Sequence, residues 1–284
     1  MAKIQGIKKQ IALVRQIQHV THAMKTLSAV RLRLGKETVE QVRHFVENLK
    51  KNLETIELYM PSLVFPEDRI LLLAIFSDKG LVGGFNKNVA DAVFRFVELK
   101  GLPRVKIAIL GKQGERELRE LQKNVVLVSS LSLHHVPHYA GVRDLAFRIM
   151  KMREEGRYTY LYIAFTRYFS ITSRALQIVQ VFPPQLHTKL LPIQDRKKLE
   201  VEHLLFGDLI SLRRTLEQQY LVGMLYQTVM ESFVSEHAAR FTIMDAATTH
   251  SKDIIESLTI FYHKKRQERI TQELNEVTSA AEVL

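Results

Sequence analysis

The segment from Ser77 to Asn86 reads Ser-Asp-Lys-Gly-Leu-Val-Gly-Gly-Phe-Asn, a composition that could bind a phosphate group. It lies between an apolar run and a helix-like segment, and a glycine loop at such a place can hold an anion at a helix N-terminus. The spacing matches neither G-x-x-x-x-G-K-[ST] nor G-x-G-x-x-G. We therefore expect a turn whose glycines adopt positive φ angles rather than a nucleotide site.

Three histidines, His134, His135 and His138, have a type and spacing that could bind a metal ion. Zinc in proteins is held by His, Cys and carboxylate ligands, and no nearby thiol or carboxylate completes this set. The chain has no cysteine, and it lacks a nucleophile elbow of the G-x-S-x-G type. The sequence thus predicts no catalytic site, no metal and no cofactor.

Cations gather near the C-terminus, where the segment from Lys264 to Arg269 reads Lys-Lys-Arg-Gln-Glu-Arg. A frayed, solvated end of the chain would explain the charges alone. The apolar spacing, however, continues to Val283 and Leu284, where an exposed tail usually becomes polar. We therefore expect another protein to enclose this tip.

The first of the elements that carry these residues is an N-terminal helix from Lys3 to Met60, ended by Pro61. Its apolar residues recur every three or four positions, which predicts a coiled-coil seam with one slipped step between Val14 and Ile17. The predicted seam residues are Ile4, Ile7, Ile11, Val14, Ile17, Val20, Met24, Leu27, Val39, Val42, Val46, Leu49, Leu53 and Ile56.

The C-terminal segment from Met224 to Leu284 contains neither glycine nor proline. A helix of that length, on the order of 90 Å, is too long to lie inside a domain of this size. The N-terminal helix is the obvious partner, because the two helices bracket everything else in the sequence. The pattern predicts an antiparallel coiled coil in which the longer C-terminal helix extends beyond its partner.

The middle of the chain alternates between strand and helix patterns, which favours a small, mainly parallel sheet covered by helices. The predicted strands are 70–76, 105–110, 125–128, 158–165 and 176–182, and the predicted helices are 86–99, 115–121 and 144–152. The expected fold class is α/β with long helices. It combines a coiled-coil helix in 1–60, a Rossmann-like foot domain in 61–200 and a second coiled-coil helix in 201–284.

The net charge of +11 favours acidic partners, and every charged residue from Met1 to Lys36 is basic. One reading is a basic coiled-coil protein that binds nucleic acid, and another is a small nucleotide-dependent enzyme built on the α/β domain. The missing phosphate motif weighs against the second reading. The absence of cysteine and of an apolar run of roughly 18–20 residues predicts a soluble chain in a reducing compartment.

Three stretches resemble the gamma subunits of F-type ATP synthases. Residues 17–25 resemble the family's T-Q-K-I-T-K-A-M-K/E segment, and the glycine loop 77–86 resembles S-D-R-G-L-C-G-G-F-N. The most specific match is C-terminal and comprises 235–240, 244–248, 258–259, 266–267 and 270–274. The motifs occur in family order and span essentially the whole chain.

This resemblance implies that the chain is the central stalk, or rotor shaft, of an F-type ATP synthase. In the family, the terminal helices turn inside a hexameric ring of α and β subunits. The α/β domain belongs to the foot, which sits with the epsilon subunit on the membrane c-ring. Ion flow turns the rotor and drives ATP synthesis or hydrolysis at the β subunits, so this subunit has no catalytic site, inserts no segment into the membrane and binds no nucleic acid.

The resemblance also assigns subunit contacts by position. At the tip, the residues that match contacts with the β subunit's catch loop are Arg266, Gln267, Thr271 and Glu273. The neck contacts are Met24 with its neighbour Lys25, and Arg240. Lys79, Gly80 and Val82 match the loop that faces the acidic lever of the β subunit.

The middle domain departs further from the family pattern than the shaft does. The family's loop cysteine is Val82 here, and the usual Asn-x-Phe is replaced around 166–169. Foot contacts are therefore carried over less closely than shaft contacts. A start at Met1 without a transit peptide favours a bacterial chain, located on the cytoplasmic face of the plasma membrane as part of the complex.

Overall fold

The computed structural model describes residues 2–59, 69–129, 131–133, 135–186 and 208–282. The chain divides into two compact units. Unit 1 contains 1–29 and 240–284, and unit 2 contains 30–239. Helix α1 (Ala2–Tyr59) and helix α6 (Leu209–Glu282) each contribute one segment to both units. The two units are described separately below.

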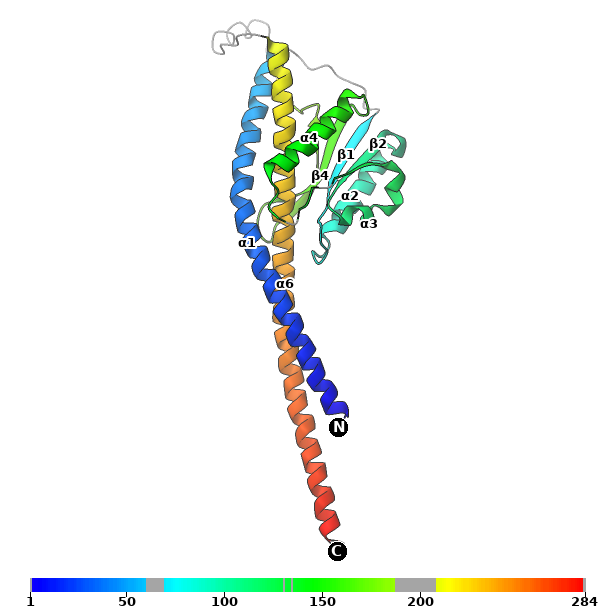
Figure 1. Ribbon diagram of the computed structural model, residues 1–284, viewed down its shortest axis with the longest axis vertical. Coiled ribbons are helices and arrows are strands. Elements are labelled where there is room, and N and C mark those ends of the chain that lie inside the picture. The colour runs from blue at the N-terminus through cyan, green and yellow to red at the C-terminus, as the bar shows by residue number, and fades with distance from the viewer. Residues whose placement is uncertain (1, 60–68, 130, 134, 187–207, 283–284) are drawn as a thin grey trace. The chain divides into compact units, whose positions relative to one another are not determined.

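In unit 1 the segments of α1 and α6 pair in antiparallel orientation (Figure 1). The hydroxyl groups of Thr21 and Thr248 are hydrogen-bonded at 2.9 Å, and Lys25 Nζ lies 2.6 Å from Asp245 Oδ1. The residue numbers of the contacting pairs thus increase along α1 and decrease along α6, as in an antiparallel pair. The C-terminal end of α6 extends beyond the start of α1, as the helix lengths predict (Figure 1).

The seam of α1 follows an unbroken heptad, so the predicted slip between Val14 and Ile17 is wrong. The heptad positions in unit 1, all buried or half-buried, are Ile4, Ile7, Ile11, Val14, Gln18, Thr21, Lys25 and Ser28. Met24, which we expected in the seam, is half-buried beside them. Ile17, Val20 and Leu27, which we expected in the seam, are instead 48–58% exposed. Polar side chains occupy the seam here because Thr21 and Ser28 find hydrogen-bond acceptors, so the apolar pattern misleads over this stretch.

In unit 2 the same heptad is apolar and closely packed, as predicted for Val39 to Ile56. Val39, Val46, Leu49, Leu53 and Ile56 are buried. The helices also approach closely at a glycine, because a Cβ atom on Gly35 would lie 2.7 Å from a methyl group of Val234. A larger residue at this position would push the two helices apart.

Unit 2 also holds a five-stranded sheet of order β3-β2-β1-β4-β5 (Figure 1). Its first four strands are parallel, and β5 is antiparallel to β4. This confirms the predicted α/β class with a mainly parallel sheet. The elements are β1 (Ile70–Ile75), α2 (Phe85–Lys100), η1 (Leu102–Arg104), β2 (Val105–Leu110), α3 (Gln113–Glu117), η2 (Arg119–Asn124), β3 (Val125–Ser129), α4 (Tyr139–Glu154), β4 (Tyr160–Tyr168) and β5 (Arg174–Phe182).

Helices cover both faces of this sheet. On one face α4 and the coiled-coil helices pack against alternate strand residues such as Leu71, Leu73 and Ile163. On the other face α2 packs against Ile70 and Leu72 and their neighbours. Strand β1 is buried along its whole length, which explains why its sequence is continuously apolar rather than alternating.

Two element predictions need correction. The short helix expected at 115–121 is divided into α3 and the 3-10 helix η2, with Leu118 between them. The helix expected at 144–152 begins earlier, at Tyr139, directly after His138. Four of its residues, Val142, Leu145, Ala146 and Ile149, face the core, and the first of them lies outside the predicted range.

Candidate interaction surfaces

The C-terminal end of α6 presents one face of mixed apolar and polar side chains. Arg266, Gln267, Thr271 and Glu273 are all exposed, as are Ile270, Leu274 and Val277, which are 48–70% exposed. At 100° per residue these seven positions fall within one arc of less than half the helix circumference, roughly 160°. The structure therefore brings the four predicted tip residues onto one face together with apolar side chains.

Ion pairs along the helix organise the charges of this tip. Arg269 Nε lies 2.7 Å from Glu273 Oε1, one helical turn away. Lys265 pairs with Glu268 in the same way. Exposed pairs of this kind stabilise a helix by about 0.3–0.5 kcal/mol each. They hold Arg269 and Glu273 in place on the surface, and Arg266 follows directly after Lys265 of the first pair.

The neck contains the predicted residues Met24, Lys25 and Arg240. Lys25 occupies a seam position, pairs with Asp245 across the two helices, and lies 5.7 Å from the centre of the Phe241 ring. Arg240 is buried, with 6% of its surface exposed. The structure thus brings Lys25 to the C-terminal motif that contains Asp245, with its side chain 31% exposed, and it buries Arg240.

The glycine loop of unit 2 follows β1 and ends at the start of α2. The expectation that its glycines adopt positive φ holds for Gly83 (φ 59°) but not for Gly80 or Gly84. Instead Leu81 has a φ of 62° and is 65% exposed. A leucine in the left-handed region costs roughly 1–2 kcal/mol, and such strain concentrates at functional sites.

Buried hydrogen bonds fix the two ends of this loop. Ser77 N donates to Asn86 Oδ1 at 3.0 Å, and Ser77 Oγ donates to the carbonyl oxygen of Lys79 at 2.7 Å. Asp78 accepts a hydrogen bond from Leu133 N at 2.7 Å. Ser77, Asp78 and Asn86 are thus used to position the loop. Lys79, Gly80 and Leu81 form its exposed part, whereas Val82 is buried and 3% exposed.

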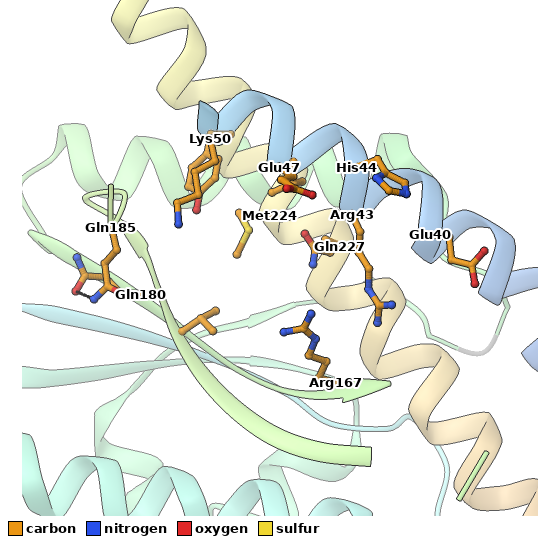
Figure 2. A pocket seen from close by; sticks show the side chains of 13 residues that line it. Glu40, Arg43, His44, Glu47, Lys50, Arg167, Gln180, Gln185, Met224 and Gln227 are labelled. Atoms are coloured by element: carbon orange, nitrogen blue, oxygen red, sulfur yellow. Dashed lines mark hydrogen bonds between the residues drawn. The ribbon is translucent and has the colours of Figure 1, made fainter. Parts of the chain in front are cut away.

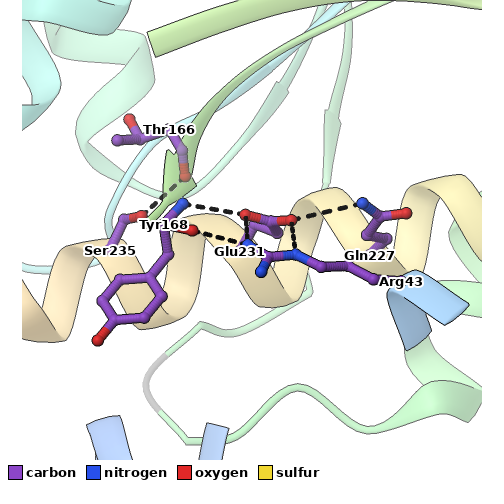
Figure 3. Close-up of polar contacts among 6 residues, drawn as sticks. All are labelled: Arg43, Thr166, Tyr168, Gln227, Glu231 and Ser235. Carbon is purple, nitrogen blue, oxygen red and sulfur yellow. Dashed lines mark hydrogen bonds and ion pairs between the residues drawn. The ribbon is translucent and has the colours of Figure 1, made fainter. Parts of the chain in front are cut away.

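A polar cluster that sequence reasoning missed joins α1, α6 and the sheet (Figure 3). Arg43 donates from Nε and Nη2 to the two carboxylate oxygens of Glu231, at 2.7 and 2.8 Å. Arg43 Nη2 also donates to the carbonyl oxygen of Tyr168, and Tyr168 N donates to Glu231 Oε2 at 2.9 Å. We call these three residues the Arg43–Glu231 clip.

The clip is buried at its acidic end, because Glu231 has no exposed surface. The hydrogen bond from Arg43 to Glu231 raises the pKa of the arginine above its ordinary value. Next to it, Ser235 Oγ donates to the carbonyl oxygen of Thr166 at 2.9 Å. Helix α6 is therefore hydrogen-bonded to the end of β4 at several points. A single acid within the apolar run 229–234 was the signal that could have revealed it.

Helix α6 also contacts the carboxyl end of the sheet, where ligands bind in many α/β proteins. In open α/β sheets, ligands bind outside the carboxyl ends of strands where the strand order reverses, which here lies between β1 and β4. At the end of β4, side chains of α6 already hydrogen-bond the main chain: Ser232 accepts from Thr166 N at 3.2 Å, and Ser235 and Glu231 bind nearby. On the β4 side of this point, main-chain groups that a ligand could use are thus already bonded to α6.

Of the three histidines considered as metal ligands, His134 lies outside the described residues. Within the described ranges, no three His, Cys, Asp or Glu side chains gather as metal ligands would. His138 immediately precedes α4, without a side-chain cap hydrogen bond to that helix. None of the helices in the described part of the chain has the length and hydropathy required to cross a bilayer.

Comparison with known proteins identifies the family of the chain. The family model described as ATP synthase matches residues 3–284. The chain is 29% identical to the ATP synthase gamma chain of Geobacter metallireducens and 26% identical to that of Trichlorobacter lovleyi, covering 99% of both chains in each case. These relatives are thus matched along their whole length.

Solved structures show the same fold. One is the central stalk and c-ring structure of Tetrahymena thermophila mitochondrial ATP synthase, with a TM-score of 0.60, 20% identity and coverage of 80% of this chain and 99% of that chain. Another comes from Euglena gracilis mitochondrial ATP synthase, with a TM-score of 0.59, 16% identity and coverage of 98% and 91%. Together with the full-length family match, these similarities establish that the chain belongs to the ATP synthase family, as one of its gamma chains.

Proposed function

We propose that this chain is the central rotor shaft of an F-type ATP synthase and has no catalytic site of its own. The full-length match to gamma chains carries this proposal. The proposed partners are the hexameric ring of α and β subunits, the epsilon subunit and the membrane c-ring. We place the complex on the cytoplasmic face of a bacterial plasma membrane, since the similar gamma chains from Geobacter and Trichlorobacter are bacterial.

The shaft works by selecting conformations in other subunits. Ion flow turns the membrane ring, the attached shaft rotates, and its unequal faces favour open or closed states in successive β subunits. The tip face of α6 supports this role, because Ile270, Leu274 and Val277 are exposed in the isolated chain and would be covered inside a ring. Arg266, Gln267, Thr271 and Glu273 supply polar contacts on the same face.

The basic N-terminal part of α1 and the loop at Lys79 and Gly80 provide positive charge for contacts with the α and β subunits. Every charged residue up to Lys36 is basic, which complements an acidic surface on the surrounding subunits. The strained, exposed Leu81 projects from the same loop. We assign Met24, Lys25, Arg240 and Val82 a positioning part in these contacts, because burial or pairing holds them inside their own units.

We further propose the division of the chain into a helix in 1–60, a foot domain in 61–200 and a helix in 201–284. The absence of a separate catalytic site is supported by the carboxyl end of β4, where side chains of α6 already bind the main chain. The comparisons lend no support to the nucleic-acid alternative, since they lead to ATP synthase gamma chains.

Reconstitution tests the proposal directly. The chain is mixed with α and β subunits of the same organism, and complex mass and ATP turnover are compared with and without it. We expect one copy to join six larger subunits and to raise cooperative multisite turnover. A chain that stays apart from the ring, or that hydrolyses ATP by itself, contradicts the proposed role.

A further inference from the structure

A cleft of about 640 Å³ lies in unit 2 between α1, α6 and the sheet edge formed by β4 and β5 (Figure 2). Residues 40–50 of α1 line one side, a length of about 15 Å along the helix. Apolar side chains from three elements, Val46, Val179 and Met224, contribute to its lining. None of the tip, neck or loop residues discussed above belongs to this cleft.

Arg167 is the cation that the sheet contributes to the cleft. Its side chain extends from β4 toward α6 (Figure 2), and its Nε atom is buried without a hydrogen-bond partner in the described part of the chain. The guanidinium remains charged at any pH at which the protein is folded. Arg43, the other arginine of the cleft, is already bound to Glu231. The Arg167 guanidinium lies 5.4 Å from the centre of the Phe169 ring, a contact that leaves its terminal N–H groups able to bind an anion.

The edge of β5 faces the same space. Within the described sheet, β5 is one of the two edge strands and pairs with β4 only. Two successive residues of β5, Val179 and Gln180, both line the cleft. Because successive side chains of a strand point to opposite faces, one face alone could not present both. The strand therefore presents its edge to the cleft. A strand edge offers unpaired N–H and C=O groups, to which an extended peptide can add as a further strand.

Two acidic residues limit what can bind. Glu40 and Glu47 on α1 line the cleft together with Lys50, so several negative charges of one ligand could not all avoid these two carboxylates. A ligand with a single carboxylate can bind Arg167 without bringing further negative charges close to Glu40 and Glu47. The apolar lining in turn favours apolar residues on either side of that carboxylate.

We propose that this cleft binds an extended polypeptide segment of another rotor subunit, in which one Asp or Glu flanked by apolar residues forms an ion pair with Arg167 while its backbone adds to β5. The site is a surface distinct from the contacts that couple the shaft to the ring. This inference rests on the proposed rotor role in one respect: the partner is taken to be a subunit of the same ATP synthase complex.

Hydrogen exchange tests this docking. The exchange of Arg174–Phe182 amides is measured by mass spectrometry in the whole ATP synthase and in the smaller complex of this chain with α and β subunits alone. We expect at least about tenfold slower exchange in the whole complex, because added strand pairing protects the edge amides. Arg167→Met should abolish that slowing, since a charge-assisted hydrogen bond contributes about tenfold or more to affinity. Arg95→Gln, on the exposed surface of α2, should leave it unchanged.

A misfolded variant would not produce this result. Replacing Arg167 removes a buried atom that lacks a partner, so the isolated Arg167→Met chain should unfold at the same denaturant concentration as the wild type or a higher one. In addition, a photo-crosslinking amino acid at His44, on the rim of the cleft, should attach to a peptide that contains an acidic residue between apolar ones.

The outcomes separate the two proposals. Failure of the chain to enter any ATP synthase complex overturns the rotor role and, with it, the partner named here. Entry into the complex with equal β5 exchange in both assemblies overturns the docking inference alone. Crosslinks to lipid or to nucleic acid, or slowing that persists in Arg167→Met, also overturn it.

Discussion

Replacing Glu231 by alanine should weaken the attachment of the shaft helices to the sheet. Removing one partner of a buried ion pair costs about 3–5 kcal/mol, because the other charge is left uncompensated. The Glu231 side chain is fully buried, but that of Arg43 is 30% exposed and can recover part of its hydration. Tyr168 N would lose its acceptor as well. We therefore expect a loss of about 3 kcal/mol in the free energy of unfolding.

Urea unfolding of the full chain measures this loss. Tyrosine fluorescence can follow the transition, because the chain has nine tyrosines and no tryptophan. Glu231→Gln should lose less, about 1–2 kcal/mol, because the amide oxygen can still accept a hydrogen bond. Glu47→Ala is the matched control. Glu47 is 62% exposed and pairs with Lys51 at 3.4 Å on the surface of the same coiled coil, so its removal should cost less than about 0.5 kcal/mol.

The reasoning is refuted if Glu231→Ala unfolds within about 0.5 kcal/mol of the wild type. The same holds if Glu231→Ala and Glu47→Ala have equal effects, because burial would then contribute nothing. A loss confined to Glu231→Ala, together with faster hydrogen exchange at the end of β4, would instead support the role of the clip in joining helix and sheet.

Three further predictions concern other parts of the chain. Gly111→Ala should cost about 2–3 kcal/mol of unfolding free energy, because Gly111 has a φ of 96° and a Cβ atom would overlap a carbonyl oxygen just after β1, whereas Gly80→Ala, in open space, should be nearly neutral; a denaturant titration of both variants checks this. Burial raises the pKa of Tyr220 to about 12, with the charge of Glu54 adding to the effect, so the stability it contributes is present below pH 10 and is lost as the pH rises from 10 through 12. Tyr220→Phe should therefore flatten the fall in thermal midpoint over that range, and an equally steep fall would contradict the assignment. Replacing Arg266 and Gln267 together by alanine should lower multisite ATP turnover of the reconstituted complex and leave single-site nucleotide binding nearly intact; loss of nucleotide binding itself would argue against a shaft contact.

Much of the fold could be predicted from the sequence because local patterns agree with the tertiary structure over most of the chain. The buried strand at 70–75 is continuously apolar, and the parallel sheet explains why. The apolar heptad from Val39 to Ile56 likewise corresponds to the packed seam of unit 2. In both places, hydrophobic burial alone determines which residues lie inside.

The prediction fails where polar groups occupy buried positions. Thr21, Ser28 and Lys25 lie in the seam because they form hydrogen bonds or an ion pair there, and no apolar pattern marks them. The clip at Glu231 depends on residues 188 positions apart in the sequence, so spacing cannot reveal it. The candidate contacts at the tip and neck came from resemblance, because their roles depend on surfaces of other subunits.

The rotor role itself is tested most directly by observing rotation. The chain has no cysteine, so Leu99→Cys, at a position that is 85% exposed on α2, provides a single attachment point for a visible probe. The α and β ring is fixed to a surface, ATP is added, and the probe is followed by microscopy. The account predicts stepwise rotation in one direction that stops when ATP is removed. A probe that remains stationary while the same complexes hydrolyse ATP would contradict it.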